Sequence, residues 1–524
     1  KNNFMTTNLY TDYENTIGKH YFKMLVGVQT EKRNLRSFNA YRNGILIDGY
    51  RTLDMTTGIS LDGETIPPSV GGDVNEWATA GFFGRVNYDF DKRYLLEVSM
   101  RYDGSSRFRR GSRWCFSPSF SAGWNLSNEK FWESLADYVN TFKLRASYGQ
   151  LGNQNVSGYY PTYVEMPIGI NNGLIINGVR SNTASVPGLV APTLTWETVK
   201  TTNAAFDIGL FDNRLTGSFD YYIRNTNNMV GPAQELPNIL GTSNPGINNT
   251  SLRTRGFELS VNWRDQLECG LSYGVNFVLS NSKTIITSYP NLTGDLGTYI
   301  AGQDPNDIYG YVTVGIAQSD EEMQEYLSKV DQSRIGTGWQ AGDIMYADLD
   351  KDGVITTGKY TLEDHGDLKK IGNSRAKFPF GIRLNADYKG FDLSLYFQGR
   401  FDYQILNMYQ MYYGLVAEPG MNLLEDAYGK NGHIKSGKVM CDYFLEDGDY
   451  FRLDNITLGW TPKLDTKWIS NLRVYATVKN AFTITKYSVM DPTSVDINGL
   501  EPGISGLNVY PIARSFTFGI QISY

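Results

Sequence analysis

A short acidic motif is the stretch of this sequence with the clearest potential for chemistry. It reads Asp348-Leu-Asp350-Lys-Asp352-Gly-Val354, so carboxylates recur at every second position before a glycine that permits a sharp turn. Carboxylate and backbone carbonyl oxygens are the ligands that hard divalent cations prefer. We therefore predict a Ca²⁺ or Mg²⁺ site formed by the side chains of Asp348, Asp350 and Asp352 and by the carbonyl of Val354.

The alternative interpretation is a solvated acidic turn without a bound ion. The twelfth position of an EF-hand loop carries a glutamate that binds calcium through both oxygens, and here that position is Lys359. Glu363 or Asp364, or Asp343 from upstream, is a candidate for the missing ligand. Both interpretations stay open at the level of the sequence.

Other patterns that suggest enzymes have simpler explanations. Residues Gly270 to Gly274 match the G-x-S-x-G nucleophile motif, but they lie within a strand pattern rather than at a strand-to-helix turn. The three histidines, His20, His365 and His433, are far apart in the chain. No phosphate-binding glycine loop is evident. We predict that the protein is not an enzyme.

The composition favours one large sheet over several ordinary domains. The chain has 524 residues with 36 Tyr, 26 Phe and 54 Gly, and it has no apolar run long enough for a spanning helix. A net charge of −7 without a basic cluster argues against nucleic acid as a partner. Cys115, Cys269 and Cys441 are too far apart for a disulfide framework or a zinc motif.

Period-two alternation of apolar and polar residues predicts the elements that must position any site. In the last strand one face is apolar and carries Phe516, Phe518, Ile520, Ile522 and Tyr524. Similar patterns occur within 82–102, 116–124, 142–148, 215–224, 257–279 and 380–398. Strands of about ten residues can cross a lipid bilayer, and their polar faces suit a water-filled lumen. The five apolar residues with their terminal aromatic also resemble the assembly signal of outer-membrane barrels.

The connections between these strands are alternately short and long, as in membrane barrels with periplasmic turns and extracellular loops. The short ones are 14–18, 91–92, 210–214, 265–269, 389–390 and 461–469. The long ones are 33–76, 152–194, 228–252, 284–375, 403–448 and 484–512. The alternation holds if 126–139 is an inner turn, 104–112 is an outer one, and the strand-like stretch 308–316 belongs to an outer loop. We predict an all-β, transmembrane, antiparallel β-barrel with about fifteen strands in this chain.

An odd number of strands indicates that the barrel is larger than this chain. Bacterial single-chain barrels have an even number of strands. We therefore interpret residues 1–524 as the C-terminal part of a larger barrel, embedded in the outer-membrane bilayer.

Four motifs in a fixed order carry a resemblance to a known family. They are Arg101–Phe108, Phe116–Trp124 followed by Asn128–Phe131, Leu144–Gln154, and Trp196–Thr198 leading to Phe211–Leu215. Together they resemble the SusC/RagA-type TonB-dependent transporters of Bacteroidetes outer membranes, over essentially the whole chain.

The resemblance implies a barrel of about 22 strands that is plugged by an N-terminal domain. It also implies a SusD-like surface lipoprotein as a lid, energy from the TonB complex, and dimers of transporter–lipoprotein pairs. Residues 1–524 contain no plug, TonB box or N-terminal strands, so we expect an N-terminal plug and barrel fragment as a further partner. Substrates of such transporters are usually oligosaccharides and sometimes oligopeptides.

The functional prediction is active import of a nutrient oligomer, with an oligosaccharide as the first choice and an oligopeptide as the second. The alternatives are a TonB-dependent receptor for a siderophore or metal chelate, a passive porin or structural barrel, and a soluble multi-blade β-protein. Four aromatic residues of the outer loops, Trp339, Tyr409, Tyr412 and Tyr413, are candidates for contact with ligand or lid. Loop packing or a membrane-interface position explains such residues equally well.

Overall fold

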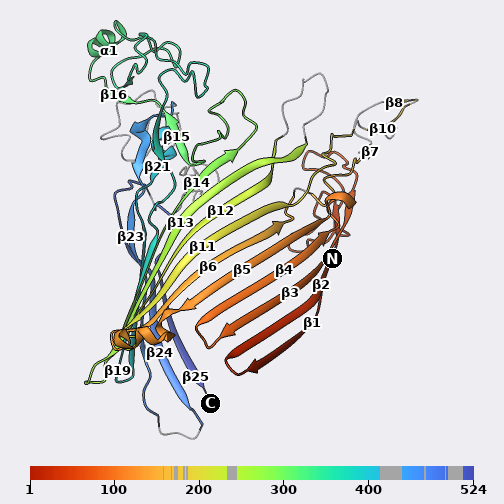
Figure 1. Ribbon diagram of the computed structural model, residues 1–524. Helices are drawn as coiled ribbons and strands as arrows, with labels where there is room; N and C mark the ends of the chain where they lie inside the picture. The colour runs from red at the N-terminus through yellow and green to blue at the C-terminus, as the bar shows by residue number, and fades with distance from the viewer. Residues whose placement is uncertain are drawn as a thin grey trace. The chain divides into compact units, whose positions relative to one another are not determined.

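The computed structural model describes residues 1–156, 158–166, 168–169, 175–176, 178–180, 183–184, 187–232, 245–413, 439–464, 468–489, 491–493 and 512–523. Hydrogen bonds join fifteen strands into one sheet in the order β1-β2-β3-β4-β5-β6-β11-β12-β13-β14-β19-β20-β23-β24-β25 (Figure 1). Neighbours in the sheet are neighbours along the chain, as in a meander of antiparallel hairpins. The predicted fold class and number of strands are confirmed.

The strands of this sheet are long. Their bounds are β1 Asn2–Ile17, β2 His20–Tyr41, β3 Ser69–Phe90, β4 Tyr94–Ser105, β5 Trp114–Asn125, β6 Val139–Asn153, β11 Glu197–Leu210, β12 Leu215–Pro232, β13 Gly246–Gln266, β14 Ser272–Ser288, β19 Phe380–Tyr388, β20 Phe391–Arg400, β23 Tyr450–Trp460, β24 Asn471–Thr485 and β25 Ser515–Ser523.

Shorter elements lie in the connections. They are the strands β7 Ile168–Gly169, β8 Ile175–Ile176, β9 Val179–Arg180, β10 Thr183–Ala184, β15 Asp307–Gly310, β16 Thr313–Ile316, β17 Ile344–Tyr346, β18 Lys369–Asn373, β21 Gln404–Leu406 and β22 Leu445–Asp447, the helices α1 Asp320–Leu327 and α2 Met408–Tyr413, and the 3-10 turns 110–112, 126–128, 130–135 and 442–444. Neither α1 nor α2 has the length and apolar character needed to span a membrane.

Contacts within the chain define two compact units. The first, unit 1, comprises residues 1–122, 148–200 and 226–249, and the second, unit 2, comprises 123–147, 201–225 and 250–524.

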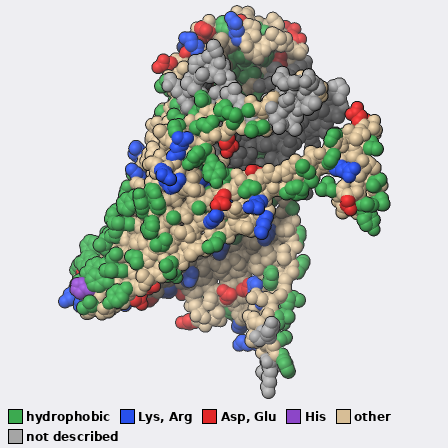
Figure 2. Space-filling view, turned by 90° about the vertical axis from the view of Figure 1, so that its right-hand side faces the viewer, with side chains coloured by type: hydrophobic (Ala, Val, Ile, Leu, Met, Phe, Trp, Pro, Cys, Tyr) green, Lys and Arg blue, Asp and Glu red, His purple; other side chains and the backbone are tan. Residues whose placement is uncertain are grey.

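The apolar face of these strands is exposed and the polar face is partly buried, which is the reverse of the pattern in a soluble protein. On β3 and β4 of unit 1, Phe82 and Met100 are 52% and 44% exposed. On the other face of the same strands, Arg101 forms a half-buried ion pair with Asp103 at 2.9 Å. Figure 2 shows hydrophobic side chains gathered in patches at the lower left of the surface. A soluble protein would bury the apolar face, so this pattern favours a sheet whose apolar face meets lipid.

Tight turns at one end of the sheet explain why the short connections are short. Lys389 and Gly390 join β19 to β20 with φ of 49° and 87°, the conformation of a type I′ hairpin turn. A Cβ at position 390 would lie 2.6 Å from the carbonyl oxygen of Thr461, so glycine is required there. Such turns set the register of the strands that follow them.

Two connections show where the sequence pattern predicts the structure correctly and where it does not. The predicted long connection 33–76 is shorter in the structure, because β2 and β3 stay paired out to Tyr41 and Ser69. Polar pairs such as Lys32 with Glu76 hold this part of the hairpin together, so the apolar alternation does not mark it. The stretch 308–316 lies in a loop as predicted, since β15 and β16 pair with β18 and β17 rather than with the large sheet.

Candidate functional site

Two long connections of unit 2 fold together into one structure, which we call the loop module. It comprises the described residues of 289–379, between β14 and β19, and of 401–449, between β20 and β23. Both connections contribute to one buried core. That core consists of Tyr311, Ile344, Tyr346, Ile355, Leu368, Leu406, Met411, Cys441 and Phe444.

Backbone hydrogen bonds join the two connections of the loop module. The N–H of Tyr311 donates to the carbonyl of Met440 at 3.0 Å, and the N–H of Asp442 donates to the carbonyl of Tyr311 at 3.1 Å. Burial raises the pKa of the Tyr311 phenol to about 12, so this core residue stays neutral. Loops that share a core hold their exposed side chains more firmly than separate loops would.

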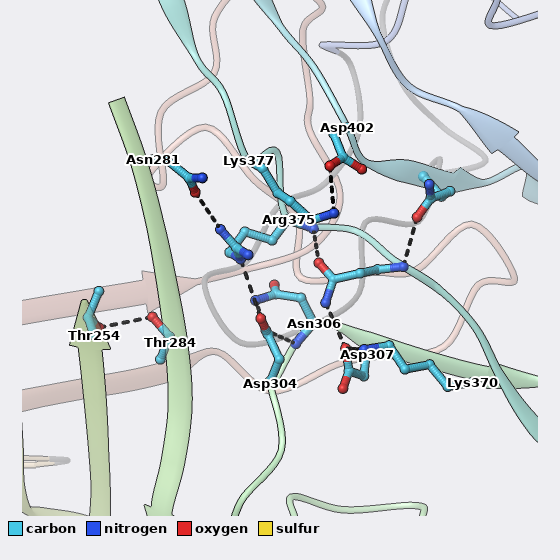
Figure 3. Close-up of polar contacts among 12 residues, drawn as sticks. Thr254, Asn281, Thr284, Asp304, Asn306, Asp307, Lys370, Arg375, Lys377 and Asp402 are labelled. Carbon is cyan, nitrogen blue, oxygen red and sulfur yellow. Dashed lines mark hydrogen bonds and ion pairs between the residues drawn. The ribbon is translucent and has the colours of Figure 1, made fainter. Parts of the chain in front are cut away.

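A polar network attaches the loop module to strand β14 (Figure 3). Arg375 Nε lies 3.4 Å from Asp304 Oδ2, and the two side chains are only 16% and 5% exposed. Nη1 of the same guanidinium donates to Oδ1 of Asn281 in β14 at 3.4 Å. Two further ion pairs in this network are Lys370–Asp307 and Lys377–Asp402.

A cavity of about 410 Å³ opens on the polar face of unit 2. Residues of β12, β13, β14, β19, β20 and β23 line it, together with Pro379 of the loop module. Its size falls in the range of small-molecule binding sites. The polar and aromatic side chains of the lining are Ser218, Asp220, Glu258, Ser260, Ser280, Phe380, Tyr396, Gln398, Arg400 and Tyr450.

Two of the charges at this cavity have no ion-pair partner among the described residues. Glu258 is exposed and Arg400 is half-buried. Asp220 differs, because Arg145 holds it at 3.2 Å while also binding Asp207 at 2.8 Å. The cavity therefore presents a carboxylate, a guanidinium and hydroxyl groups, which can bind sugar hydroxyls or peptide groups.

A buried ion pair connects the polar face of β23 to the segment after β24. Arg452 Nη2 lies 2.6 Å from Asp491 Oδ1, and the side chains are 4% and 14% exposed. Arg452 also donates to Thr483 of β24 at 2.9 Å. Arg452 also donates to Thr493 at 3.3 Å, so it links residues 491–493 to β23.

Three carboxylates of the predicted metal motif and its surroundings come together in the loop module. Oxygens of Asp348, Asp350 and Asp367 lie within 4.8 Å of one another. Asp367 is absent from the sequence prediction; it is fully buried, and two backbone N–H groups hold its oxygens at 2.7 and 2.8 Å. Asp352 is not in this group, and its carboxylate accepts from the N–H of Val354 at 2.7 Å. The chemistry of the three carboxylates fits a hard cation, and ion binding itself stays a prediction.

The pKa of Asp350 lies above its ordinary value, through desolvation together with repulsion from neighbouring carboxylates. The N–H of Asp352 lowers that pKa, but desolvation and the carboxylates of Asp367, Asp352 and Asp348 outweigh it, so the net shift is upward. A carboxyl with a raised pKa contributes stability at low pH, and this contribution is lost as the pH rises through the raised pKa. A bound cation would relieve the same repulsion.

We expect Ca²⁺ to stabilise the chelator-treated protein, by about 2.7 kcal/mol at an ion concentration 100 times the Kd. Asp350→Asn should abolish the effect with little other damage, because among the described residues this carboxylate accepts a hydrogen bond only from the N–H of Asp352, at 3.1 Å. Protons compete for the same oxygens, so the effect should shrink as the pH falls toward the raised pKa. Thermal unfolding with and without CaCl₂, at two pH values, measures it. Asp48→Asn, in the exposed connection 42–68, is the control, and equal calcium responses of the two variants would contradict the prediction.

The predicted aromatic ligand contacts lie in the loop module. Trp339 packs against the core, and its indole N–H donates to the carbonyls of Gln332 and Gly336 at 3.2 and 3.0 Å. Tyr409, Tyr412 and Tyr413 belong to helix α2, but their side chains lie outside the described residues. Contact of these residues with a ligand or lid stays a prediction.

The predicted assembly signal forms β25 at the edge of the sheet. Phe516, Phe518, Ile520 and Ile522 are 53% to 83% exposed, and β25 pairs with β24 through its whole length. Tyr524 lies outside the described residues. The exposed apolar stripe agrees with a strand that meets lipid, while its recognition by an assembly machinery stays a prediction.

Sequence reasoning missed the ion pairs that organise the site. Arg145 and Asp220 occupy polar faces in the sequence pattern, but only the register brings them together with Asp207. Arg375 and Asp304 lie within a long connection without any alternation. A count of charged residues within the long loops could have pointed to Arg375 and Asp304, whereas no signal in the sequence pairs Arg145 with Asp207 and Asp220.

Comparison with known proteins gives a consistent picture. Residues 1–481 match the family model described as TonB dependent receptor-like, beta-barrel. TonB-dependent receptor P3 of Formosa agariphila is 27% identical over 98% of this chain and 52% of its own length. TonB-dependent receptor SusC of Bacteroides thetaiotaomicron is 26% identical over 99% and 50%. The chain thus spans about half the length of these curated relatives.

A solved structure shares the fold. The structure described as that of the RagAB peptide transporter superposes with a TM-score of 0.80, at 22% identity, over 100% of this chain and 55% of the matched chain. At that level of identity the similarity concerns the fold alone.

Proposed function

This chain belongs to the TonB-dependent receptor-like β-barrel family of the outer membrane, and from that premise we propose that it forms the wall of an importer for a nutrient oligomer. The family consists of receptors and transporters rather than enzymes, which agrees with the prediction that the chain is not an enzyme. The cavity on the polar face carries the proposal, because it places free hydrogen-bonding groups where a solute would pass.

An oligosaccharide is the cargo that we propose first. Exposed Glu258, half-buried Arg400 and several hydroxyls line a cavity that also contains Tyr396 and Tyr450. Carboxylate and guanidinium groups bind sugar hydroxyls, and tyrosine rings provide apolar surface for the faces of sugar rings. An oligopeptide is the second candidate, since RagAB, which shares the fold, is described as a peptide transporter.

We further propose a SusD-like surface lipoprotein as the lid and the TonB complex as the source of energy. The resemblance to SusC/RagA-type transporters supports both, as does the loop module, whose shared core gives a partner a firm surface to dock on. Dimers of transporter–lipoprotein pairs are part of the same proposal. Affinity purification of the tagged complete protein from detergent-solubilised outer membranes tests it. A lipoprotein in equal amount is the expected result, and purification without any lipoprotein would contradict the lid.

Filling the cavity should stop import while the barrel stays folded. Ser260→Trp places a large side chain among the lining residues, and we expect uptake of the cognate oligomer to fall at least about tenfold, a change of about 1.4 kcal/mol. Uptake of labelled oligosaccharides and oligopeptides by whole cells measures the loss and identifies the cargo.

The matched control for this variant is Ser272→Trp. Ser272 is the first residue of β14 and lies on the same face as Ser260 of β13, because Ser260 pairs with Val278 and Gln266 with Ser272, and it does not line the cavity. Normal uptake by the Ser272→Trp strain would show that a tryptophan on this face is tolerated. Equal uptake by both variant strains would remove the cavity from the transport path, and loss of chelated iron uptake alone would favour the siderophore receptor.

A further inference from the structure

Four arginines lie in one short connection of unit 1, between β4 and β5. Arg107, Arg109, Arg110 and Arg113 belong to the segment 106–113, which contains no acidic residue. In the described part of the chain none of the four forms an ion pair, whereas Arg101 of the preceding strand is paired with Asp103. Four cations without a counter-charge create a local positive potential that attracts anions.

Neighbouring groups hold two of these guanidinium groups in fixed positions. Arg107 Cζ lies 5.1 Å from the centroid of the Trp77 ring. Arg109 Cζ lies 5.4 Å from the centroid of the Tyr163 ring, and the same guanidinium donates to the carbonyl of Thr162 at 2.6 and 3.0 Å. Stacking uses the face of a guanidinium, so N–H groups at its edge remain for a ligand.

Three buried donors beside these arginines have no hydrogen-bond partner among the residues that the structure describes. They are the Nε of Arg107, the Nε1 of Trp77 and the Oγ1 of Thr162. Thr162 is completely buried and Trp77 is 9% exposed. Buried polar groups in proteins nearly always have a partner, and all three of these can donate. A ligand rich in acceptor oxygens would satisfy them.

We propose that Arg107, Arg109 and Arg110 form a binding site for an anionic group of the phosphate, sulfate or carboxylate class. Guanidinium groups bind such oxyanions in a bidentate manner. The connection 106–113 lies at the end of β4 opposite the tight turn at Asp91, the end that also carries the long connections 42–68 and 154–196. In the proposed importer that end faces the cell exterior, where an acidic oligosaccharide cargo or the anionic headgroup of lipopolysaccharide supplies the group. The first source rests on the proposed function, and the second does not.

Binding measurements on the complete protein in detergent test the site. The probes are a chondroitin sulfate hexasaccharide, an uncharged maltohexaose, and nanodiscs with or without lipopolysaccharide. The double variant Arg109→Gln/Arg110→Gln should bind one anionic probe about tenfold more weakly than the wild type, with a weaker dependence on salt. Maltohexaose binding should not change. Weaker binding of the hexasaccharide by the double variant identifies a glycan ligand. Weaker binding of the nanodiscs that contain lipopolysaccharide identifies the lipid headgroup as the ligand.

Two further variants keep the test decisive. Arg110→Gln alone changes an exposed side chain, so a partial loss of affinity there cannot come from misfolding. Arg51→Gln, an arginine of 76% side-chain exposure in the connection 42–68, controls for net charge. Unchanged affinity of the double variant for both anionic probes, or an equal loss in Arg51→Gln, would overturn the proposal. The import test with Ser260→Trp is independent of these residues, so failure of one proposal is distinguishable from failure of the other.

Discussion

Arg452→Met is expected to lower the free energy of unfolding by about 3 kcal/mol, the cost of leaving one member of a buried ion pair without its partner. The Asp491 side chain is 14% exposed, so water reaches it poorly once the arginine is gone. The variant also loses the hydrogen bond to Thr483. Unfolding of the detergent-solubilised protein by heat or guanidinium measures the change, and hydrogen exchange of the peptide around Asp491 should rise in parallel.

A second substitution separates the cost of the unpaired carboxylate from the cost of lost packing. Adding Asp491→Leu to Arg452→Met removes the unpaired carboxylate and should restore most of the lost stability. Arg473→Met is the matched control, because its pair with Asp392 has side chains that are each 26% exposed, and a loss of about 1 kcal/mol or less is expected there. A loss below about 1 kcal/mol for Arg452→Met would show that the buried pair does not hold residues 491–493.

Met100→Lys is expected to destabilise the inserted sheet by about 2 to 4 kcal/mol, the cost of a cation near the midplane of the bilayer on a lipid-facing position. Met100 lies near the middle of β4, opposite Gly84 of β3, and is 44% exposed on the apolar face. Equilibrium unfolding from lipid vesicles gives the free energy. The amount of folded protein in isolated outer membranes should fall as well.

The adjacent residue gives the control for the lipid-facing position. Ser99→Lys introduces the same charge one residue away, on the polar face opposite Arg85. Water on that face solvates the ammonium group, so a loss of about 1 kcal/mol or less is expected. Equal losses for Met100→Lys and Ser99→Lys would contradict the assignment of the two faces.

The alternation of side chains was enough to predict the sheet, because a strand with one face in lipid and one in water repeats every two residues. The number of strands and the short turns followed from it. The pattern failed in β2 and β3 beyond about Arg33 and Glu76, where polar pairs replace apolar ones. Alternation reports the surroundings of a side chain rather than the hydrogen bonds of its backbone, so a strand that extends past the apolar zone escapes it.

The site was harder to predict than the sheet. The motif at Asp348 and Asp350 could be found because its ligands are close in sequence, whereas Asp367 joins them only through folding of the loop module. The pair of Arg375 and Asp304 is 71 residues apart, and no local rule brings such residues together. Trp339 is one of the predicted contact residues. Packing and hydrogen bonds within the loop module hold its side chain, and the sequence alone does not reveal these contacts.

The loop module has a consequence for the order in which the chain folds. Hairpins that are joined by short turns, such as β13 with β14 and β19 with β20, have local contacts and can form one at a time. The module instead brings Tyr311 next to Cys441, which requires closing a loop that contains β19 and β20. Closure over such a distance is slow compared with hairpin formation. The module should therefore be the last part of this region to fold, and the appearance of its buried core marks the moment when β14, β19, β20 and β23 are in register.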